Sequence, residues 1–194
     1  EIEDVSKLKS FLADMENCFH GSSSGIDPLQ CYLGKPFVLS NRQSAVSNQQ
    51  IVDILSHDFI SEDIHIFLID TRIKSPTAPL VEHFKELRND KSYLEKFNNE
   101  YVPLISKCIS NLIDKNNDVF FSNLLHLSKL QTELLTHTIP ENFIQYFLTD
   151  INKEGFQVKL CGAGGGGYLL GFAKDIEKTN EFWHNFGCKI AWIK

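Results

Sequence analysis

The 194-residue chain has no long hydrophobic run and no excess of positive charge. None of its apolar stretches approaches the roughly 18–20 residues that a membrane-spanning helix needs, so we expect no membrane segment. Its 25 Asp and Glu residues outnumber its 19 Lys and Arg residues, which gives a formal net charge of -6. Because proteins that bind nucleic acids or anionic membranes are usually basic, this balance argues against both partners.

The five cysteines show no pairing pattern. No C-x-x-C spacing and no closely spaced histidine pair occurs, so the sequence predicts neither a disulfide framework nor a zinc site. A reducing, cytoplasmic location is therefore expected, and no secretory signal is recognised. Cys161 lies beside a run of glycines, and we interpret it as a small buried thiol under a turn rather than as a nucleophile.

Two familiar nucleotide-binding patterns are missing as well. The stretch GAGGGG at residues 162–167 fits G-x-G-x-x-G by its letters, but a strand-like run at 168–173 follows it where a dinucleotide-binding fold opens a helix. No lysine follows the glycines, which excludes G-x-x-x-x-G-K-[ST]. The bare backbone amides are suited to approach a phosphate or a loop that holds one, and the alternative is an ordinary glycine-rich hairpin turn.

Hydrophobic periodicity predicts an α+β protein. Strand-like runs cover residues 35–40, 64–71, 157–162, 168–173 and 188–194. Helical spacing covers 2–18, 79–88, 92–112, 120–134, 140–155 and 176–186. Within 92–112, Ser92 and Glu95 form a capping-box pattern, and Pro103 is expected to kink the helix.

We expect the last four strands to form one antiparallel sheet, with the amphipathic helices on one face of it. The polar stretch at residues 41–50 is the best candidate for a domain boundary. Residues 1–45 would then be the tail of an N-terminal domain, and residues 46–194 a C-terminal domain. A parallel, doubly wound sheet or an all-helical fold would contradict this prediction.

The stretch HGSSSGID at residues 20–27 breaks the first helical segment. Serine, glycine and aspartate are common turn residues, so a solvated loop would explain this stretch if it stood alone. His20 by itself is likewise more typical of a satisfied interior histidine than of a catalytic one. The combination of this turn with the later glycine run is more specific than either stretch.

Together the two stretches resemble the second and third motifs of the GHMP kinases, which include galactokinase, homoserine kinase, mevalonate kinase and phosphomevalonate kinase. The mevalonate kinase branch is the most similar. The second motif, H-G-x-P-S-G-x-D, is matched by His20, Gly21, Ser24, Gly25 and Asp27. The third motif, a glycine-rich loop, is matched by Gly162, Ala163, Gly164, Gly165, Gly166 and Gly167.

The resemblance implies a phosphotransferase that moves the γ-phosphate of ATP to an alcohol, with Mg²⁺ as cofactor and a mevalonate-like small molecule as the favoured acceptor. It implies Asp27 as the catalytic base and Glu16, eleven residues earlier, as a magnesium ligand. His20, Ser24 and Thr77 are implied as substrate contacts. The glycine loop at 162–167 would support the ATP phosphates, and a homodimer stays open.

The chain also departs from the family pattern. Ser23 stands where mevalonate kinases usually have proline, and Pro28 stands where many have asparagine, which leaves the acceptor open. The first family motif, P-x-x-x-G-L-G-S-S-A, which wraps the ATP phosphates, does not occur, nor does the upstream lysine that assists the aspartate. We expect about 100–150 further residues upstream in the parent protein and no activity of this chain alone.

Two alternatives to a mevalonate-like kinase remain. One is a sugar or sugar-phosphate kinase of the same superfamily. The other is a nonenzymatic ligand-binding remnant of the fold, which the absent first motif favours. The retained aspartate, glutamate and glycine loop argue against the remnant, because glycines that bind nothing cost conformational entropy on folding without any return.

Overall fold

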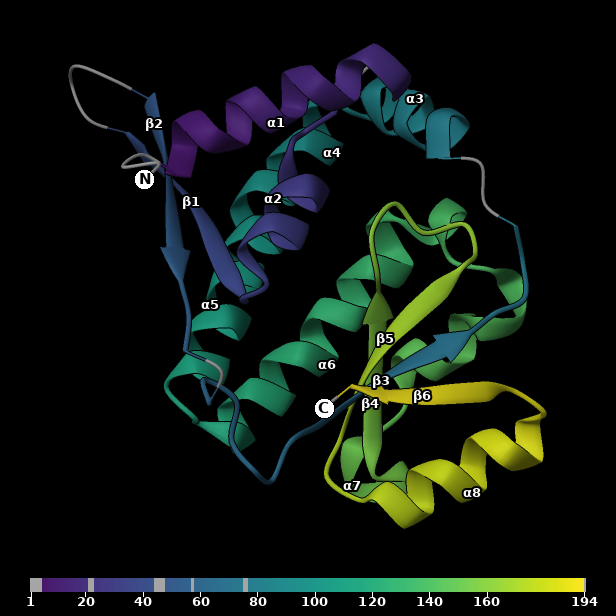
Figure 1. Ribbon diagram of the computed structural model, residues 1–194. Helices are drawn as coiled ribbons and strands as arrows, with labels where there is room; N and C mark the ends of the chain where they lie inside the picture. Colours follow the sequence, from purple (N-terminus) through teal and green to yellow (C-terminus); the bar gives the residue numbers. More distant parts are fainter. Residues whose placement is uncertain (1–4, 21–22, 44–47, 57, 75–76, 194) are drawn as a thin grey trace. The chain divides into compact units, whose positions relative to one another are not determined.

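The computed structural model describes residues 5–20, 23–43, 48–56, 58–74 and 77–193 (Figure 1). The chain divides into two compact units, Glu1–Phe59 and Ile60–Lys194, which are taken one at a time below. Among the described helices, none combines the length and the apolar character that crossing a membrane would require.

The first unit contains two helices and a β-hairpin. Helices α1 (Val5–His20) and α2 (Ile26–Leu33) flank the turn that holds the HGSSSGID motif. Strand β1 (Phe37–Gln43) pairs antiparallel with β2 (Asn48–Ile54). Residues 41–43 pair with residues 48–50, so the polar stretch proposed as a boundary supplies paired strand residues to this hairpin.

The compact units divide between Phe59 and Ile60, later than the boundary proposed from the sequence. The reason is that β2 follows the polar stretch and pairs back onto β1. The assignment of residues 1–45 and 46–194 to two kinase domains stays a prediction.

The second unit is built on a four-stranded antiparallel sheet with the order β4-β5-β3-β6. The strands are β3 (His65–Asp70), β4 (Phe156–Leu160), β5 (Tyr168–Ala173) and β6 (Lys189–Ile193). Each matches one of the last four runs that the sequence predicts as strands, with β4 beginning one residue before its run. The antiparallel pairing confirms the predicted α+β class and excludes a parallel, doubly wound sheet.

Helices follow the predicted stripes, with one interruption. The α-helices are α3 (Thr77–Leu87), α4 (Lys91–Lys96), α5 (Val102–Ile113), α6 (Asn117–Leu134), α7 (Ile151–Glu154) and α8 (Ile176–Phe186). A π-helical turn, η1 (Phe97–Tyr101), separates α4 from α5 immediately before Pro103. Proline has no N–H for the regular helical ladder, which accounts for an irregularity at this place.

Two details of the helix predictions are wrong. Asp90, rather than Ser92, caps α4, because its carboxylate accepts the N–H groups of Ser92 at 2.8 Å and Tyr93 at 3.1 Å. The helix predicted at 140–155 is mostly a 3₁₀ segment, η3 (Glu141–Leu148), followed by α7; a shorter 3₁₀ turn, η2 (Thr136–Thr138), precedes it.

Both faces of the sheet are buried, whereas the sequence predicts helices on one face. One face packs against η3 and α8, and its core includes Phe67, Ile69, Leu169, Phe147 and Trp183. The other packs against α5 and α6, and its core includes Phe172, Leu104, Phe120 and Leu124. Figure 1 shows α6 and α8 on opposite sides of the strands. In β3 and β5, the residues that point to either face of the sheet are mostly apolar, so both faces must pack against other elements.

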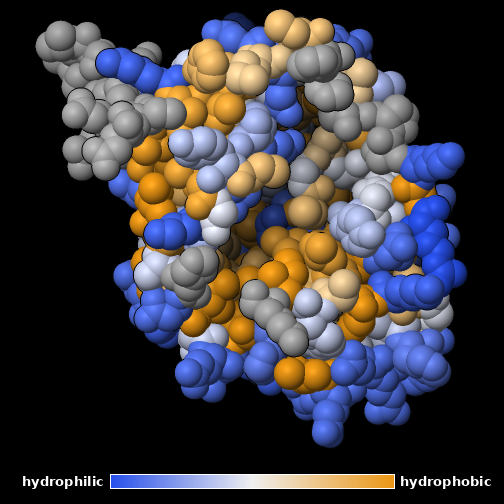
Figure 2. Space-filling view, viewed as in Figure 1, coloured by the Kyte–Doolittle hydropathy of each residue, from blue (hydrophilic) through white to orange (hydrophobic). Residues whose placement is uncertain are grey.

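The outer side of α8 remains polar. Glu177, Lys178 and Glu181 are exposed, while Trp183 on the same helix is fully buried. The lower edge of the molecule is accordingly mostly hydrophilic in Figure 2. The helix therefore buries one stripe and solvates the other, as its amphipathic pattern predicts.

Gly171 of β5 provides a test of the sheet packing. It pairs with Phe67 of β3, and a Cβ at this position would lie 2.2 Å from Cζ of the Phe67 ring. The Phe67 ring is fully buried against Phe156 and Trp192, so it has little room to move. We expect Gly171→Ala to lower the free energy of unfolding by about 1–3 kcal/mol in urea denaturation. Adding Phe67→Leu should recover part of that loss, and a fully stable single variant would contradict the close contact.

Candidate functional site

The predicted site residues belong to both units, and each half is described on its own. Glu16, Ser24 and Asp27 belong to the first unit, while the glycine loop belongs to the second. His20 ends α1 and Thr77 begins α3, but their side chains lie outside the described part of the structure. Gly21 also lies outside the described residues.

Ser23 organises the turn between α1 and α2. Its hydroxyl donates to Oε2 of Glu16 and accepts the N–H of Gly25 at 3.0 Å. Its own N–H donates to Oδ1 of Asn17 at 2.6 Å. Proline has neither the hydroxyl nor the N–H, so the departure at Ser23 creates a connection between the two helices that the family pattern would lack.

Gly25 is required by a close approach to α1. Its φ angle is 71°, and a Cβ there would lie 2.4 Å from the carbonyl oxygen of Lys9 and 3.0 Å from Cβ of Ala13. Both the left-handed backbone and the contact exclude a larger residue. The Ser23-Ser24-Gly25 turn is therefore specified by packing against the preceding helix as well as by its polar bonds.

Asp27 lies in the first turn of α2, where it is exposed. Within the described residues, its carboxylate forms no hydrogen bond or ion pair. The N-terminal end of a helix favours a negative charge at this place. Nearby, the hydroxyl of Ser24 accepts the N–H of Ile26 at 3.4 Å. The turn thus holds Glu16 through Ser23, and Asp27 has no partner among the described residues.

The glycine loop connects β4 and β5 and packs on two other segments. The N–H of Gly165 donates to the carbonyl of Thr138 at 2.5 Å, and the N–H of Gly167 donates to the carbonyl of Ile73 at 2.8 Å. A Cβ on Gly164 or Gly166 would lie 2.4 Å from one of these same two carbonyl oxygens. An ordinary hairpin turn would not need such contacts.

Part of the loop stays available. Gly162 and Ala163 are exposed, and in the part of the chain that is described their N–H groups have no hydrogen-bond partner. Exposed backbone amides in a glycine-rich turn suit an anion or the carbonyl groups of another loop. The loop is therefore packed at Gly164 and Gly166 and exposed at Gly162 and Ala163.

Two residues beside the loop were missed by the sequence analysis. Thr71 donates both its N–H, at 2.9 Å, and its hydroxyl, at 2.8 Å, to the carbonyl of Gly167. Arg72 has a φ of 58°, and its N–H donates to Oδ1 of Asp70 at 2.9 Å. The exposed Arg72 places a positive charge on the segment that supports the glycine loop. In the sequence, only the position of Thr71 and Arg72 at the end of a predicted strand pointed to these two residues.

The structure corrects the interpretation of Cys161. This residue is exposed, because β4 ends at the buried Leu160 and the chain turns outward after it. The buried thiol of the second unit is Cys108 on α5, and burial raises its pKa to about 11. Cys108 therefore stays protonated at neutral pH.

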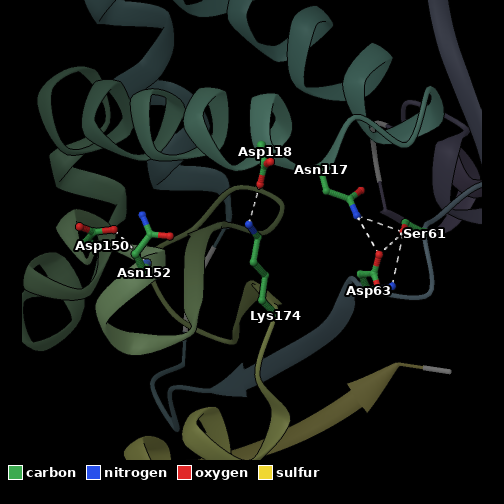
Figure 3. Close-up of polar contacts among 7 residues, drawn as sticks. All are labelled: Ser61, Asp63, Asn117, Asp118, Asp150, Asn152 and Lys174. Atoms are coloured by element: carbon green, nitrogen blue, oxygen red, sulfur yellow. Dashed lines mark hydrogen bonds and ion pairs between the residues drawn. The ribbon is translucent and has the colours of Figure 1, made fainter.

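A second polar cluster lies at the start of α6 (Figure 3). Nδ2 of Asn117 donates to Oγ of Ser61 at 3.1 Å and to Oδ2 of Asp63 at 3.5 Å, and Nζ of Lys174 pairs with Oδ1 of Asp118 at 2.9 Å. Both carboxylates already face donors. No cluster of three or more His, Cys, Asp or Glu residues suited to a metal occurs among the described residues. We interpret these contacts as structural: they hold the start of α6 against the segment before β3 and the residue after β5.

The two sides of the glycine loop can be separated by mutation. Gly162 and Gly164 both have positive φ angles, 66° and 77°, but a Cβ would contact Thr138 only at Gly164 and would find open space at Gly162. Gly162→Ala should cost about 1–2 kcal/mol from its left-handed backbone. Gly164→Ala should cost about 1–3 kcal/mol more, from overpacking, in the same urea denaturation assay. Equal losses would show that Thr138 moves away freely.

His137 of the η2 turn forms a histidine pair with His83 of α3. The ring centroids of His137 and His83 are 4.3 Å apart. Burial, followed by the neighbouring His83, lowers the pKa of His137. An unfolded histidine has a pKa near 6.5, so as the pH falls below about 6.5 the unfolded chain binds a proton before the folded chain does, and stability decreases.

We expect the melting temperature to fall between about pH 7 and pH 5, and His137→Asn to flatten this slope. His184→Asn, at an exposed position on α8, is the matched control and should leave the slope unchanged. Thermal unfolding followed by circular dichroism measures both. An identical pH slope in His137→Asn and the parent protein would contradict the assignment.

Comparisons with known proteins support the resemblance seen in the sequence. No family model matches the chain. A mevalonate kinase from Dictyostelium discoideum is 24% identical over 181 residues, which is 89% of this chain and 44% of that protein. The L. major mevalonate kinase, solved with R-mevalonate, superposes with a TM-score of 0.70 at 13% identity, over 96% of this chain and 55% of that one.

A phosphomevalonate kinase from Streptococcus pneumoniae, solved with phosphomevalonate and AMPPNP, has a TM-score of 0.67 at 14% identity and covers 98% of this chain and 62% of that one. The chain thus spans about half the length of the proteins it matches. The predicted resemblance is confirmed, and the fold is that of the GHMP kinases, consistent with their C-terminal portion.

Proposed function

We propose that this chain forms the C-terminal portion of a GHMP-type kinase that transfers the γ-phosphate of ATP to the hydroxyl of a mevalonate-like acceptor. The observation that carries the proposal is the turn between α1 and α2. It anchors the Glu16 carboxylate through Ser23 and leaves the Asp27 carboxylate exposed and without a partner among the described residues. The similarity to mevalonate and phosphomevalonate kinases supports the same reaction.

Asp27 would act on the acceptor hydroxyl. Phosphoryl transfer requires an alcohol held in line with the phosphate, a group that accepts its proton, and neutralisation of the phosphate charge. A carboxylate with no protein partner is free to orient the hydroxyl and accept its proton. Ser24, one turn away from the carboxylate, would donate a hydrogen bond to the acceptor, with His20 and Thr77 as further substrate contacts.

Glu16 fits a magnesium site. Mg²⁺ prefers oxygen ligands and is commonly held by one or two carboxylates together with substrate phosphates. The Ser23 hydroxyl donates to Oε2 of Glu16, which orients the carboxylate, and no described residue bonds its other oxygen. When bound with ATP, Mg²⁺ supplies positive charge at the β- and γ-phosphates.

The glycine loop would serve the phosphate end of the site. The exposed N–H groups of Gly162 and Ala163 suit either a phosphate oxygen or the carbonyls of a phosphate-binding loop. Arg72 adds local positive charge to a chain whose formal net charge is -6. The first family motif is absent, so we propose that the 194 residues do not turn over ATP alone. A cytoplasmic location and a homodimer stay predictions.

Asp27→Asn tests the catalytic assignment in the parent protein that we expect to carry the first motif. The substitution keeps the size of the side chain but removes the base, so kcat should fall on the order of 10²–10⁴-fold, with a much smaller change in the KM for ATP. A steady-state assay that couples ADP formation to NADH oxidation measures both parameters.

Controls separate the roles. Asp53→Asn, an exposed carboxylate on β2, should leave kcat unchanged. Glu16→Gln should raise the Mg²⁺ concentration required for half-maximal rate. The isolated 194 residues should read at background in the same assay. A folded Asp27→Asn enzyme with kcat within a few-fold of the parent would end the catalytic assignment, because asparagine serves a turn as well as aspartate does.

A further inference from the structure

The second unit contains a large apolar cavity, and apart from Gly162 and Ala163 its lining residues have no role in the phosphoryl transfer proposed above. Its volume is about 510 Å³, within the roughly 300–1,000 Å³ typical of small-molecule sites. The walls come from α3, α5, α6 and the face of the sheet that packs against α5 and α6. They include Phe84, Ile105, Ile109, Leu124, Leu127 and Leu170. Gly162 and Ala163 of the glycine loop lie at one edge.

Among the described lining residues, Lys159 is the only Lys or Arg. Lys159 of β4 pairs across the sheet with Leu170 of β5, and both residues border the cavity. Its Nζ donates to the carbonyl of Leu160 at 2.5 Å and forms no ion pair among the described residues. Burial lowers the pKa of Lys159; Cys161 and Cys108 act weakly in the opposite direction, and no carboxylate contributes. An ammonium group in such surroundings is unfavourable unless an anion joins it.

A second donor lies in the same wall. The hydroxyl of Tyr101 accepts a hydrogen bond from Nε2 of Gln131 at 3.0 Å, and Oε1 of Gln131 accepts the N–H of Leu160 at 3.0 Å. Within the described residues no group accepts the proton of the Tyr101 hydroxyl, and burial raises the pKa of Tyr101, so it remains a donor. These hydrogen bonds connect Tyr101 through Gln131 to the backbone of Leu160, which follows Lys159 in β4.

Among the described residues that line the cavity there is no Asp or Glu. The thiol of Cys108, which also lines the cavity, is neutral because its pKa is raised to about 11. The described lining of the cavity therefore offers apolar walls, the Lys159 ammonium group and the Tyr101 hydroxyl, with no carboxylate to oppose an anion. A neutral hydrocarbon would leave Lys159 unpaired, and a nucleotide would find too few polar partners for its base and ribose.

We propose that this cavity binds an amphipathic monoanion, an unbranched aliphatic chain with one carboxylate, whose head group pairs with Lys159 and accepts the Tyr101 hydroxyl. The hydrocarbon lies along the α5 and α6 side chains. This site needs neither ATP nor the first kinase motif, although it borders Gly162 and Ala163, whose amides we propose for the phosphate end of the kinase site. An alkyl phosphate shares the same chemistry, and the experiment distinguishes the two head groups.

The test is isothermal titration calorimetry of the chain with dodecanoate, kept below the concentration at which it forms micelles. We expect saturable binding of one dodecanoate per chain. Dodecanol, with the same hydrocarbon and no charge, should bind about tenfold or more weakly, the size of one charge-assisted hydrogen bond. Dodecyl phosphate is the third arm: tighter binding than dodecanoate would assign the site to a phosphate head group and overturn the carboxylate assignment.

Variants locate the site. Lys159→Met keeps most of the side-chain length, removes the charge and should weaken dodecanoate binding about tenfold or more without weakening dodecanol binding. Lys107→Met, at an exposed position of α5, is the matched control and should bind like the parent. Ile109→Trp should fill the cavity and abolish binding of both ligands. Unsaturable uptake by the parent chain, equal affinity for dodecanoate and dodecanol, or full affinity in Lys159→Met would overturn the proposal.

Discussion

The loop between β4 and β5 depends on two backbone hydrogen bonds, from the N–H of Gly165 to Thr138 and from the N–H of Gly167 to Ile73. The two acceptors come from distant parts of the second unit, one after β3 and the other after α6. Their carbonyl oxygens occupy the space that side chains at Gly164 and Gly166 would need. Tertiary packing therefore accounts for two of the loop glycines, and the amides of Gly162 and Ala163 are what remains for a ligand.

Helix α6 completes the edge of the sheet that leads into this loop. The hydroxyl of Ser128 donates to the carbonyl of Val158 at 2.7 Å, and Gln131 accepts the N–H of Leu160. An edge strand would otherwise present unpaired backbone groups. The same Gln131 also bonds Tyr101, so one buried side chain connects the edge strand, the helices and the wall of the apolar cavity. The loop and the cavity share the end of β4 as their common support.

In the first unit, Ser23 shows how a departure from a family pattern acquires a role. A proline would stiffen the turn by fixing its own φ angle. Serine instead connects Glu16, Asn17 and Gly25 by hydrogen bonds through its hydroxyl and its N–H. The turn is thus held by polar bonds to the end of α1, and the glutamate that we propose as a magnesium ligand is one of the groups it holds.

The sequence by itself determined the α+β class, the four sheet strands and the order of two motifs, because hydrophobic periodicity and turn residues record local backbone preference. Only the tertiary structure decided that both faces of the sheet are covered, that Asp90 caps α4 and that Cys161 is exposed. It also decided which residues support the glycine loop. Thr71 and Gly167 are 96 residues apart, and no local pattern reports a hydrogen bond that exists only after the chain has packed.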